Sequence, residues 1–480
     1  MMTVTVAALP KFLRAPGRRE WFASGVGGDI MSHSFRCERE VMSGTLETFH
    51  LMTFDCKVNL YESGLLRSQC VRAGLGERRE LVEADLVIIN TCGVTASAVG
   101  KSRRAARRAL RKNPKAVVVA TGCAVDLNRA DFEAIEGVRI VPHSEKAHFL
   151  EKLLRVSPGR VVPECRRTRA LLKVQDGCDR LCTYCVVPHV RSRLWSKPLD
   201  EALEEARCLA RRGHREIVLT GVRLGLYDGG GEDSPARLLA ALEDVDGLAR
   251  VRLSSIDLND VSDALLEAMA RSTKFCPHLH ISLQSGDDAL LARMHRPYDS
   301  GGYLRRLGEI RRALGRVAIT TDVIVGFPGE SEEQFENTLR VCREAAFSKI
   351  HIFPFSARPP APAADMPDKI DPREIRRRVG ALAALERELA MNYRRAMLGD
   401  VVEVLVEGRV DGMLEGKTRD YVTVAFEGED SLTGGIVRLQ ITDVGPYGHS
   451  QSRLTNANRE RNIRNHQEVK ARTVDFARTD

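Results

Sequence analysis

Short apolar runs alternate with amphipathic stretches in the part of the chain that follows residue 43. The apolar runs are ETFHLMTF (47–54), ADLVIIN (84–90), KAVVVATG (115–122) and GVRIVP (137–142). The stretches with helical spacing are NLYESGLLRSQCVRAG (59–74) and SAVGKSRRAARRALRKN (97–113). Continuous apolar strands with helices between them are typical of a parallel sheet that is covered on both faces. We therefore expect residues 44–155 to form a flavodoxin-like, doubly wound α/β domain.

The same alternation resumes further along the chain. The predicted strands are ALLKVQ (170–175), EIVLTGV (216–222), RVRLSSI (250–256), HLHISLQ (278–284), AITTDVIVGF (318–327) and KIHIFPF (349–355). Amphipathic helices are predicted between them. Six strand–helix units predict a partial (β/α)6, TIM-like barrel over residues 164–396, with its functional face at the carboxyl ends of the strands.

The remaining segments have different patterns. Residues 397–450 contain short alternating strands with glycine turns, which predict a small β-barrel. Residues 451–480 form a polar tail that we expect to be disordered. Residues 1–43 show neither pattern, and we expect a disordered or mis-started extension there.

Composition narrows the class of protein. The chain has 480 residues, 43% of them hydrophobic, and a formal net charge of +8, which suits a polyanionic partner but does not require one. No run of about 18 apolar residues is present, so we expect no membrane span. The 12 cysteines lack the spacing of a disulfide framework, which favours a reducing compartment, the cytoplasm, and metal or redox chemistry.

Three cysteines follow the first strand of the predicted barrel with the spacing C-x3-C-x2-C. They are Cys178, Cys182 and Cys185, hereafter the motif cysteines. A closed zinc or iron–sulfur site takes four protein ligands. Three thiolates on a four-iron cluster would leave one iron open to another ligand, which points to catalysis. A structural site closed by a fourth ligand, such as Cys165, is the alternative.

A second set of cysteines follows strands of the N-terminal domain. Cys56, Cys92 and Cys123, hereafter the edge cysteines, each come just after a predicted parallel strand. Open α/β sheets bind ligands at this edge. Cysteine is also a common small buried hydrophobe, but three at one edge favour a second metal site.

The C-x3-C-x2-C motif resembles that of the radical S-adenosylmethionine (SAM) enzymes. Residues 45–447 resemble the methylthiotransferase branch of that superfamily, and most of all the tRNA enzymes that act on N6-threonylcarbamoyladenosine. The segments that carry this likeness are CKVNLYES (56–63), INTCGVTASAVGKSRRAARRALRKNP (89–114) and HLHISLQSGDDALLARMHRPY (278–298). The resemblance implies a methylthiotransferase domain at 44–155, a radical SAM core at 164–396 and a TRAM RNA-binding domain at 397–450.

The resemblance also implies cofactors and site residues. A catalytic [4Fe–4S] cluster on the motif cysteines would bind SAM and yield a 5′-deoxyadenosyl radical, and an auxiliary [4Fe–4S] cluster on the edge cysteines would supply or carry sulfur. The residues expected near the cofactor are Tyr184, Gly221, Gln284, Arg296, Asp322 and Gly326. The polar members of this set, Gln284, Arg296 and Asp322, have barrel core as their alternative role.

Two segments are candidates for RNA binding. The segment KSRRAARRALRK (101–112) has seven basic residues in twelve. Its arginines Arg104, Arg107 and Arg108 would contact phosphates, or else form a solvated helix face. In the C-terminal module the candidates are Lys417, Arg419 and Tyr421, of which the tyrosine offers a stacking surface.

The function implied by the resemblance is conversion of N6-threonylcarbamoyladenosine at tRNA position 37 to its 2-methylthio derivative. The implied partners are tRNA, SAM and a reductant such as flavodoxin or ferredoxin. Three alternatives stay open: an isopentenyl-adenosine tRNA as substrate, a ribosomal protein as substrate, and a non-enzymatic RNA-binding iron–sulfur protein.

Overall fold

The computed structural model describes residues 46–445 except 55, 147 and 155–160, together with the backbone of short strands at 448–449, 465–466 and 468–473. Almost all of these residues belong to one compact unit, Glu47–Asp480. The expectation for residues 1–43 lies outside the described residues. Among the helices described, none combines the length and the apolar character needed to cross a membrane.

The N-terminal part contains a five-stranded parallel sheet with the order β2-β1-β3-β4-β5. Its strands are β1 (Thr48–Thr53), β2 (Gly76–Glu77), β3 (Leu86–Thr91), β4 (Val117–Gly122) and β5 (Val138–Val141). Its helices are α1 (Lys57–Arg72), α2 (Ala96–Lys112), α3 (Cys123–Leu127), α4 (Arg129–Glu133) and α5 (Phe149–Leu154). Every residue of β3 is buried, as its unbroken apolar run predicts for a central parallel strand.

The central part continues with parallel strands that lie in chain order. One sheet has the order β10-β9-β6 and the next has β11-β12-β13-β14. The strands are β6 (Arg169–Lys173), β9 (Glu216–Thr220), β10 (Arg250–Leu253), β11 (Ser255–Ile256), β12 (His278–Ile281), β13 (Ala318–Val325) and β14 (Lys349–Pro354). The predicted strand at 250–256 is thus two strands separated by Ser254. An antiparallel pair, β7 (Gln175–Asp176) and β8 (Trp195–Ser196), flanks the loop of the motif cysteines.

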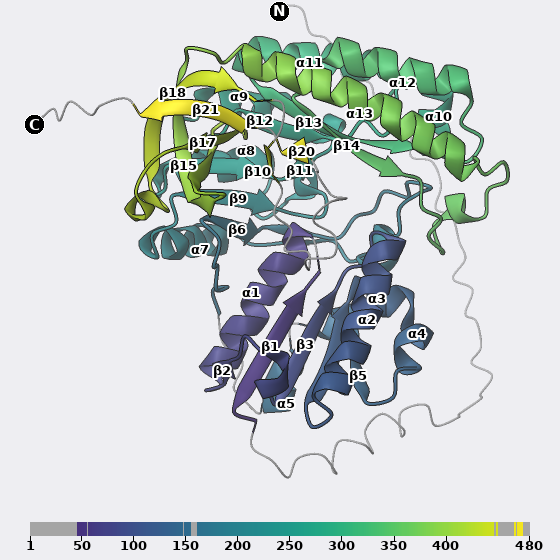
Figure 1. Ribbon diagram of the computed structural model, residues 1–480, viewed down its shortest axis with the longest axis vertical. Coiled ribbons are helices and arrows are strands. Elements are labelled where there is room, and N and C mark those ends of the chain that lie inside the picture. Colours follow the sequence, from purple (N-terminus) through teal and green to yellow (C-terminus); the bar gives the residue numbers. More distant parts are fainter. Residues whose placement is uncertain are drawn as a thin grey trace, which may run out of the picture. The chain divides into compact units, whose positions relative to one another are not determined.

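Helices cover these strands on the outside. They are α7 (Leu199–Arg211), α8 (Ser234–Ala241), α9 (Asp263–Arg271), α10 (Asp288–Arg293), α11 (Ser300–Leu314), α12 (Glu332–Ala345) and α13 (Pro372–Arg395), whereas the short α6 (Val187–Val190) follows the motif cysteines and contacts α3. Figure 1 shows α11, α12 and α13 side by side at the top of the view, above strands β12 to β14. One apolar core, which includes Leu172, Ile281 and Val323, joins the strands to these helices.

The C-terminal strands close into a barrel with the order β15-β16-β17-β21-β18 (Figure 1). They are β15 (Val401–Val410), β16 (Met413–Thr418), β17 (Thr423–Phe426), β18 (Ile436–Val444) and β21 (Glu468–Thr473). A further pair joins β19 (Gly448–His449) to β20 (Asn465–His466). The expectation of a disordered tail over 451–480 is therefore wrong at β21, which pairs with both β17 and β18. A closed barrel leaves no strand edge unpaired, and β21 completes that closure.

Candidate functional site

The edge cysteines lie at the carboxyl ends of three adjacent parallel strands. Cys56 follows β1 and caps α1, where its Sγ accepts a hydrogen bond from the Asn59 amide at 3.3 Å. Cys92 follows β3 and Cys123 follows β4, and the two residues are 4% and 9% exposed. A hydrogen bond with Cys92 and burial together raise the pKa of the Cys56 thiol. The three residues thus meet at one edge, with two of their thiols in contact.

A glycine shapes the chain before one of these cysteines. Gly122 has φ of 104°, and a Cβ built on it would lie 2.5 Å from the Thr91 carbonyl oxygen. A left-handed backbone and such close packing exclude other residues. The turn from β4 into Cys123 therefore depends on glycine.

The motif cysteines occupy a tight loop after β7. Gly177, with φ of 84°, precedes Cys178, and a Cβ there would meet the Arg193 carbonyl oxygen at 2.2 Å. The Cys185 amide donates to the Cys182 carbonyl at 3.0 Å, which folds the loop back on itself. Burial raises the pKa of the Cys185 thiol to about 12. Coordination of a metal ion would offset this shift, because a metal deprotonates the thiol that it binds.

A buried arginine faces the motif cysteines. Arg296 Nη1 donates to Cys182 Sγ at 3.5 Å, and its Nη2 pairs with Asp257 Oδ2 at 2.5 Å. Three sulfurs and a nearby guanidinium suit an anionic iron–sulfur cluster, since clusters of this kind are held by cysteine thiolates. The donor set therefore fits the group that the resemblance implies.

One residue connects the two cysteine sets. The carbonyl of Arg191 accepts a hydrogen bond from the amide of Cys178 at 3.0 Å. Its side-chain Nε donates to Cys123 Sγ at 3.4 Å. Arg191 therefore holds a motif cysteine with its backbone and an edge cysteine with its side chain. The sequence showed no sign of this role, because Arg191 is an ordinary basic residue near the motif.

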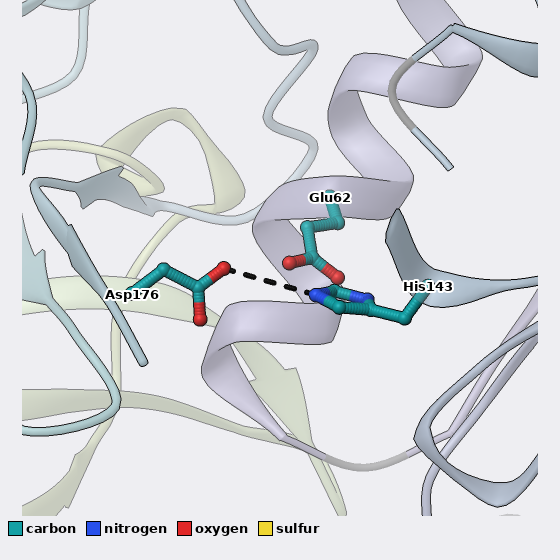
Figure 2. A group of neighbouring side chains, drawn as sticks. All are labelled: Glu62, His143 and Asp176. Carbon is teal, nitrogen blue, oxygen red and sulfur yellow. Dashed lines mark ion pairs between the residues drawn. The ribbon is translucent and has the colours of Figure 1, made fainter. Parts of the chain in front are cut away.

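Figure 2 shows a compact group formed by Glu62 on α1, His143 and Asp176. The Asp176 Oδ2 lies 3.9 Å from His143 Nε2. Burial, and then Arg191, lower the pKa of His143 to about 3, so the imidazole is neutral at pH 7. The three ligand atoms lie within 4.8 Å of one another, as in a metal site. The two carboxylates, however, already form ion pairs with basic side chains.

Three cations pair with these carboxylates. Lys146 Nζ donates to Glu62 at 2.7 Å, and Lys173 Nζ donates to Glu62 at 2.8 Å. Arg191 Nη1 lies 2.9 Å from both Glu62 and Asp176. Burial raises the pKa of Glu62, but the three cations outweigh it and hold that pKa well below its ordinary value. The group is an ion-pair network that ties α1 to the loop of the motif cysteines.

We expect Arg191→Met to lower the free energy of unfolding by about 3–5 kcal/mol, because it removes one partner from a buried ionic network. The matched control is Arg129→Met, which breaks the exposed Arg129–Glu133 pair and should cost less than about 1 kcal/mol. Urea denaturation of the two variants measures both losses. Equal losses would contradict a structural role for Arg191.

The remaining residues expected near the cofactor lie around the barrel strands. Tyr184 packs on the apolar cluster of Leu290 and Phe327. Gln284 has an unusual left-handed backbone, with φ of 68°, and its amide donates to the Asp322 carbonyl at 2.8 Å. Backbone strain of this kind is concentrated at functional sites.

The two glycines and Asp322 have distinct surroundings. A Cβ on Gly221 would lie 2.9 Å from Gln175 Oε1, and Gly326 has φ of 80°. Asp322 Oδ2 lies 3.1 Å from His280 Nε2 and accepts from Ser282 Oγ at 3.0 Å. The structure therefore brings Arg296 to the motif cysteines, whereas Asp322 is held by its own barrel neighbours.

The RNA-binding candidates fall into two environments. Arg104, Arg107 and Arg108 are exposed on α2, while Ala106 and Ala109 are buried on its opposite face. A solvated basic face is therefore present. The candidates in the C-terminal barrel, Lys417, Arg419 and Tyr421, are only partly exposed.

Residues of the β16–β17 turn pack against the central strands. Arg419 Nη2 donates to the Phe275 carbonyl at 2.7 Å. The Tyr421 ring stacks on His278 with centroids 4.8 Å apart, and Lys417 Nζ lies 5.2 Å from the centroid of the same ring. Burial raises the pKa of Tyr421, but nearby cations, Arg169 first, bring it down to about 7. These side chains hold the barrel to the central strands.

Two family comparisons match different parts of the chain. The radical SAM superfamily matches residues 172–342, a range that contains the motif cysteines. An uncharacterized protein family, UPF0004, matches residues 48–141, which contain the edge cysteines. Each cysteine set therefore falls within its own matched region.

Curated relatives match most of the chain. The threonylcarbamoyladenosine tRNA methylthiotransferase MtaB of Bacillus subtilis is 38% identical over 435 residues, which cover 84% of this chain and 95% of the relative. The enzyme of the same name from Chlamydia pneumoniae is 38% identical, with 79% and 91% covered. A tRNA-2-methylthio-N(6)-dimethylallyladenosine synthase of Syntrophotalea carbinolica is 35% identical, with 85% and 100% covered.

A solved structure shares the fold. The radical SAM methyltransferase TsrM of Kitasatospora setae, solved with tryptophan and a SAM analog, aligns with a TM-score of 0.53 at 15% identity and covers 67% of this chain and 75% of its own. At this identity the likeness concerns the fold alone. The long matches to the curated relatives are decisive: the chain belongs to the family of radical SAM methylthiotransferases.

Proposed function

We propose that this chain is a tRNA (N6-L-threonylcarbamoyladenosine(37)-C2)-methylthiotransferase, which adds a methylthio group to the adenine of N6-threonylcarbamoyladenosine at tRNA position 37. The observation that carries the proposal is the pair of cysteine sets, one at the ends of parallel strands and one in the loop after β7, with Arg191 in contact with both. The names of the MtaB relatives support tRNA as the substrate and threonylcarbamoyladenosine as the target.

The cofactors of the proposed reaction are SAM and two [4Fe–4S] clusters, one on each cysteine set. Cys178, Cys182 and Cys185 would hold a cluster that supplies one electron for the cleavage of SAM, the radical chemistry that the unreactive C2–H of adenine requires. Arg296 balances the negative charge of the thiolates from the side of Cys182. Tyr184, Gly221, Gln284, Asp322 and Gly326 remain predicted cofactor contacts.

The domain boundaries form part of the proposal. The strand order β2-β1-β3-β4-β5 supports a flavodoxin-like methylthiotransferase domain at 44–155. The parallel strands β6 to β14 support a partial TIM-like radical SAM core at 164–396. The closed barrel supports a TRAM domain at 397–450, to which β21 is added from the segment 451–480. Flavodoxin or ferredoxin is the proposed reductant, and the cytoplasm the proposed compartment.

Mass spectrometry of tRNA nucleosides from cells with and without the gene tests this function. We expect 2-methylthio-N6-threonylcarbamoyladenosine to disappear without the gene and to return with it. Loss of the 2-methylthio isopentenyl derivative instead would support the dimethylallyl substrate of the relative from Syntrophotalea carbinolica. Unchanged tRNA nucleosides would favour a ribosomal protein as substrate or a non-enzymatic role.

The basic face of α2 is the proposed site for tRNA phosphates. We expect replacement of Arg104, Arg107 and Arg108 by Ala to reduce the slope of log affinity against log salt by about two, at ~0.7 for each single-strand phosphate contact. Fluorescence anisotropy with a labelled anticodon stem-loop at several salt concentrations measures the slope.

The matched control for this test removes three other exposed arginines. These are Arg340, Arg343 and Arg387 on α12 and α13. We expect their replacement by Ala to leave the salt slope unchanged. An equal change of slope in both triple variants would mean that net charge, and not the α2 face, governs RNA binding.

A further inference from the structure

A cavity of about 500 Å³ opens between the central strands, the start of α1 and the β16–β17 turn. Strands β12, β13 and β14 contribute His280, Asp322 and His351 to its lining. The lining also includes Lys57, the first residue of α1, and Lys417 of β16. The cavity is therefore polar on several sides and is lined by three lysines, the third being Lys349.

Most charged groups of the cavity already have partners. Asp322 lies 3.1 Å from His280, and Lys349 pairs with Glu386 at 2.9 Å. Lys417 Nζ donates to the Thr423 hydroxyl. Lys57, by contrast, is exposed and has no hydrogen bond or ion pair among the described residues, although Tyr421 and Asp322 attract its charge. The cavity thus presents one ammonium group that a ligand can complete.

The position of Lys57 connects the cavity to the edge cysteines. Lys57 directly follows Cys56 and begins α1. A ligand group held by Lys57 would thus lie beside the backbone of an edge cysteine. His351 lines the same cavity, and burial lowers its pKa to about 4, so that it is neutral at pH 7 and offers a hydrogen-bond donor without charge.

We propose that Lys57 binds the carboxylate of the threonylcarbamoyl substituent on the target adenosine, and that this ion pair selects threonylcarbamoyladenosine over hydrocarbon-substituted adenosines. The inference rests on the proposed function. A threonylcarbamoyl group ends in a carboxylate, whereas a dimethylallyl group is entirely apolar. A site built to pair with a polar group rejects an analogue that lacks it, since the site's own group is then desolvated and unpaired.

Two matched RNAs test the proposal with the reconstituted holoenzyme. One is an anticodon stem-loop carrying N6-threonylcarbamoyladenosine, and the other carries the same substituent with its carboxylate converted to a carboxamide. We expect the wild type to bind the carboxylate RNA about 10- to 100-fold more tightly, the usual range for a hydrogen bond to a charged group. Equal dissociation constants for the two RNAs would overturn the proposal.

Variants of Lys57 test whether this residue causes the preference for the carboxylate RNA. Lys57→Met removes the charge and should bring the two dissociation constants together, whereas Lys57→Arg should keep the carboxylate preference. Lys152→Met, on the exposed side of α5, is the matched control and should behave as wild type. His351→Phe, far in sequence from the cysteines, removes the neutral donor of the cavity and should reduce the preference about threefold, the effect of one weaker polar contact.

The iron content of each variant, and the dissociation constant of SAM, are measured alongside. If Lys57→Met loses iron, the carboxylate preference of the wild type and its reduction in the His351→Phe variant test the proposal instead. If Lys57→Met weakens the binding of both RNAs equally, Lys57 contacts an RNA phosphate. If it weakens only the binding of SAM, Lys57 contacts the SAM carboxylate. Either result overturns the assignment to the substituent.

Product formation separates this inference from the proposed function. A carboxylate preference without any methylthio product would leave the cavity assignment standing and remove the proposed function. Methylthio product without a preference would do the opposite.

Discussion

Replacing the motif cysteines Cys178, Cys182 and Cys185 by Ala is expected to abolish reductive cleavage of SAM and all methylthio product. These thiols lie in one loop, folded back by the Cys182–Cys185 hydrogen bond and faced by Arg296. No other cysteine set follows a strand of the radical SAM region in the described residues. Liquid chromatography of 5′-deoxyadenosine measures cleavage, and mass spectrometry of the RNA measures the product.

Iron content gives a readout that does not depend on activity. Anaerobic reconstitution of the wild type should give about eight irons per chain, and the triple variant about half, by the four-iron stoichiometry of the cluster. Cys165→Ala is the control, because Cys165 Sγ donates to the Arg167 and Arg169 carbonyls at 3.5 and 3.6 Å and should hold no iron. Zinc in the wild type, or iron loss in the control, would favour a closed structural site.

Periodicity predicted the strands well where the pattern was strong. The run LVIIN became the fully buried β3, because a parallel strand between two helix layers is apolar on both faces. The predicted strand at 250–256 was instead broken at Ser254, and a sequence pattern contains no information on such an interruption. Strand β21 was missed although EVKART (468–473) alternates polar and apolar residues, because the run is short and lies within a polar segment.

The cysteine positions followed from topology, since parallel strands end at the same edge of a sheet. The ion-pair network around the cysteines did not follow from topology. Arg191 and Glu62 are 129 residues apart in sequence, and an ion pair between such distant residues has no local signature. Tyr421 likewise suggested a stacking surface for RNA, yet its ring already stacks on His278. Sequence spacing thus identified the metal-ligand candidates, while tertiary contacts decided their surroundings.

Replacing the edge cysteines Cys56, Cys92 and Cys123 by Ala is expected to stop methylthio formation while reductive cleavage of SAM continues. The motif cysteines sit on a separate loop after β7, which the substitutions do not touch. Arg191 contacts both sets, and its Glu62 and Asp176 pairs remain in place.

The measured quantities separate the two cysteine sets. Iron should fall by about half, from eight to four per chain, while 5′-deoxyadenosine formation stays within about twofold of wild type, as for loss of a single weak contact. Cys208→Ala, at a partly buried thiol on α7, is the control that should change none of these. Methylthiolated RNA from the edge-cysteine variant would show that sulfur insertion needs only the motif cysteines. Loss of SAM cleavage in the same variant would show instead that the Arg191 link makes the two sites one cooperative unit, since the contact from Arg191 Nε to Cys123 Sγ is the connection that the substitution removes.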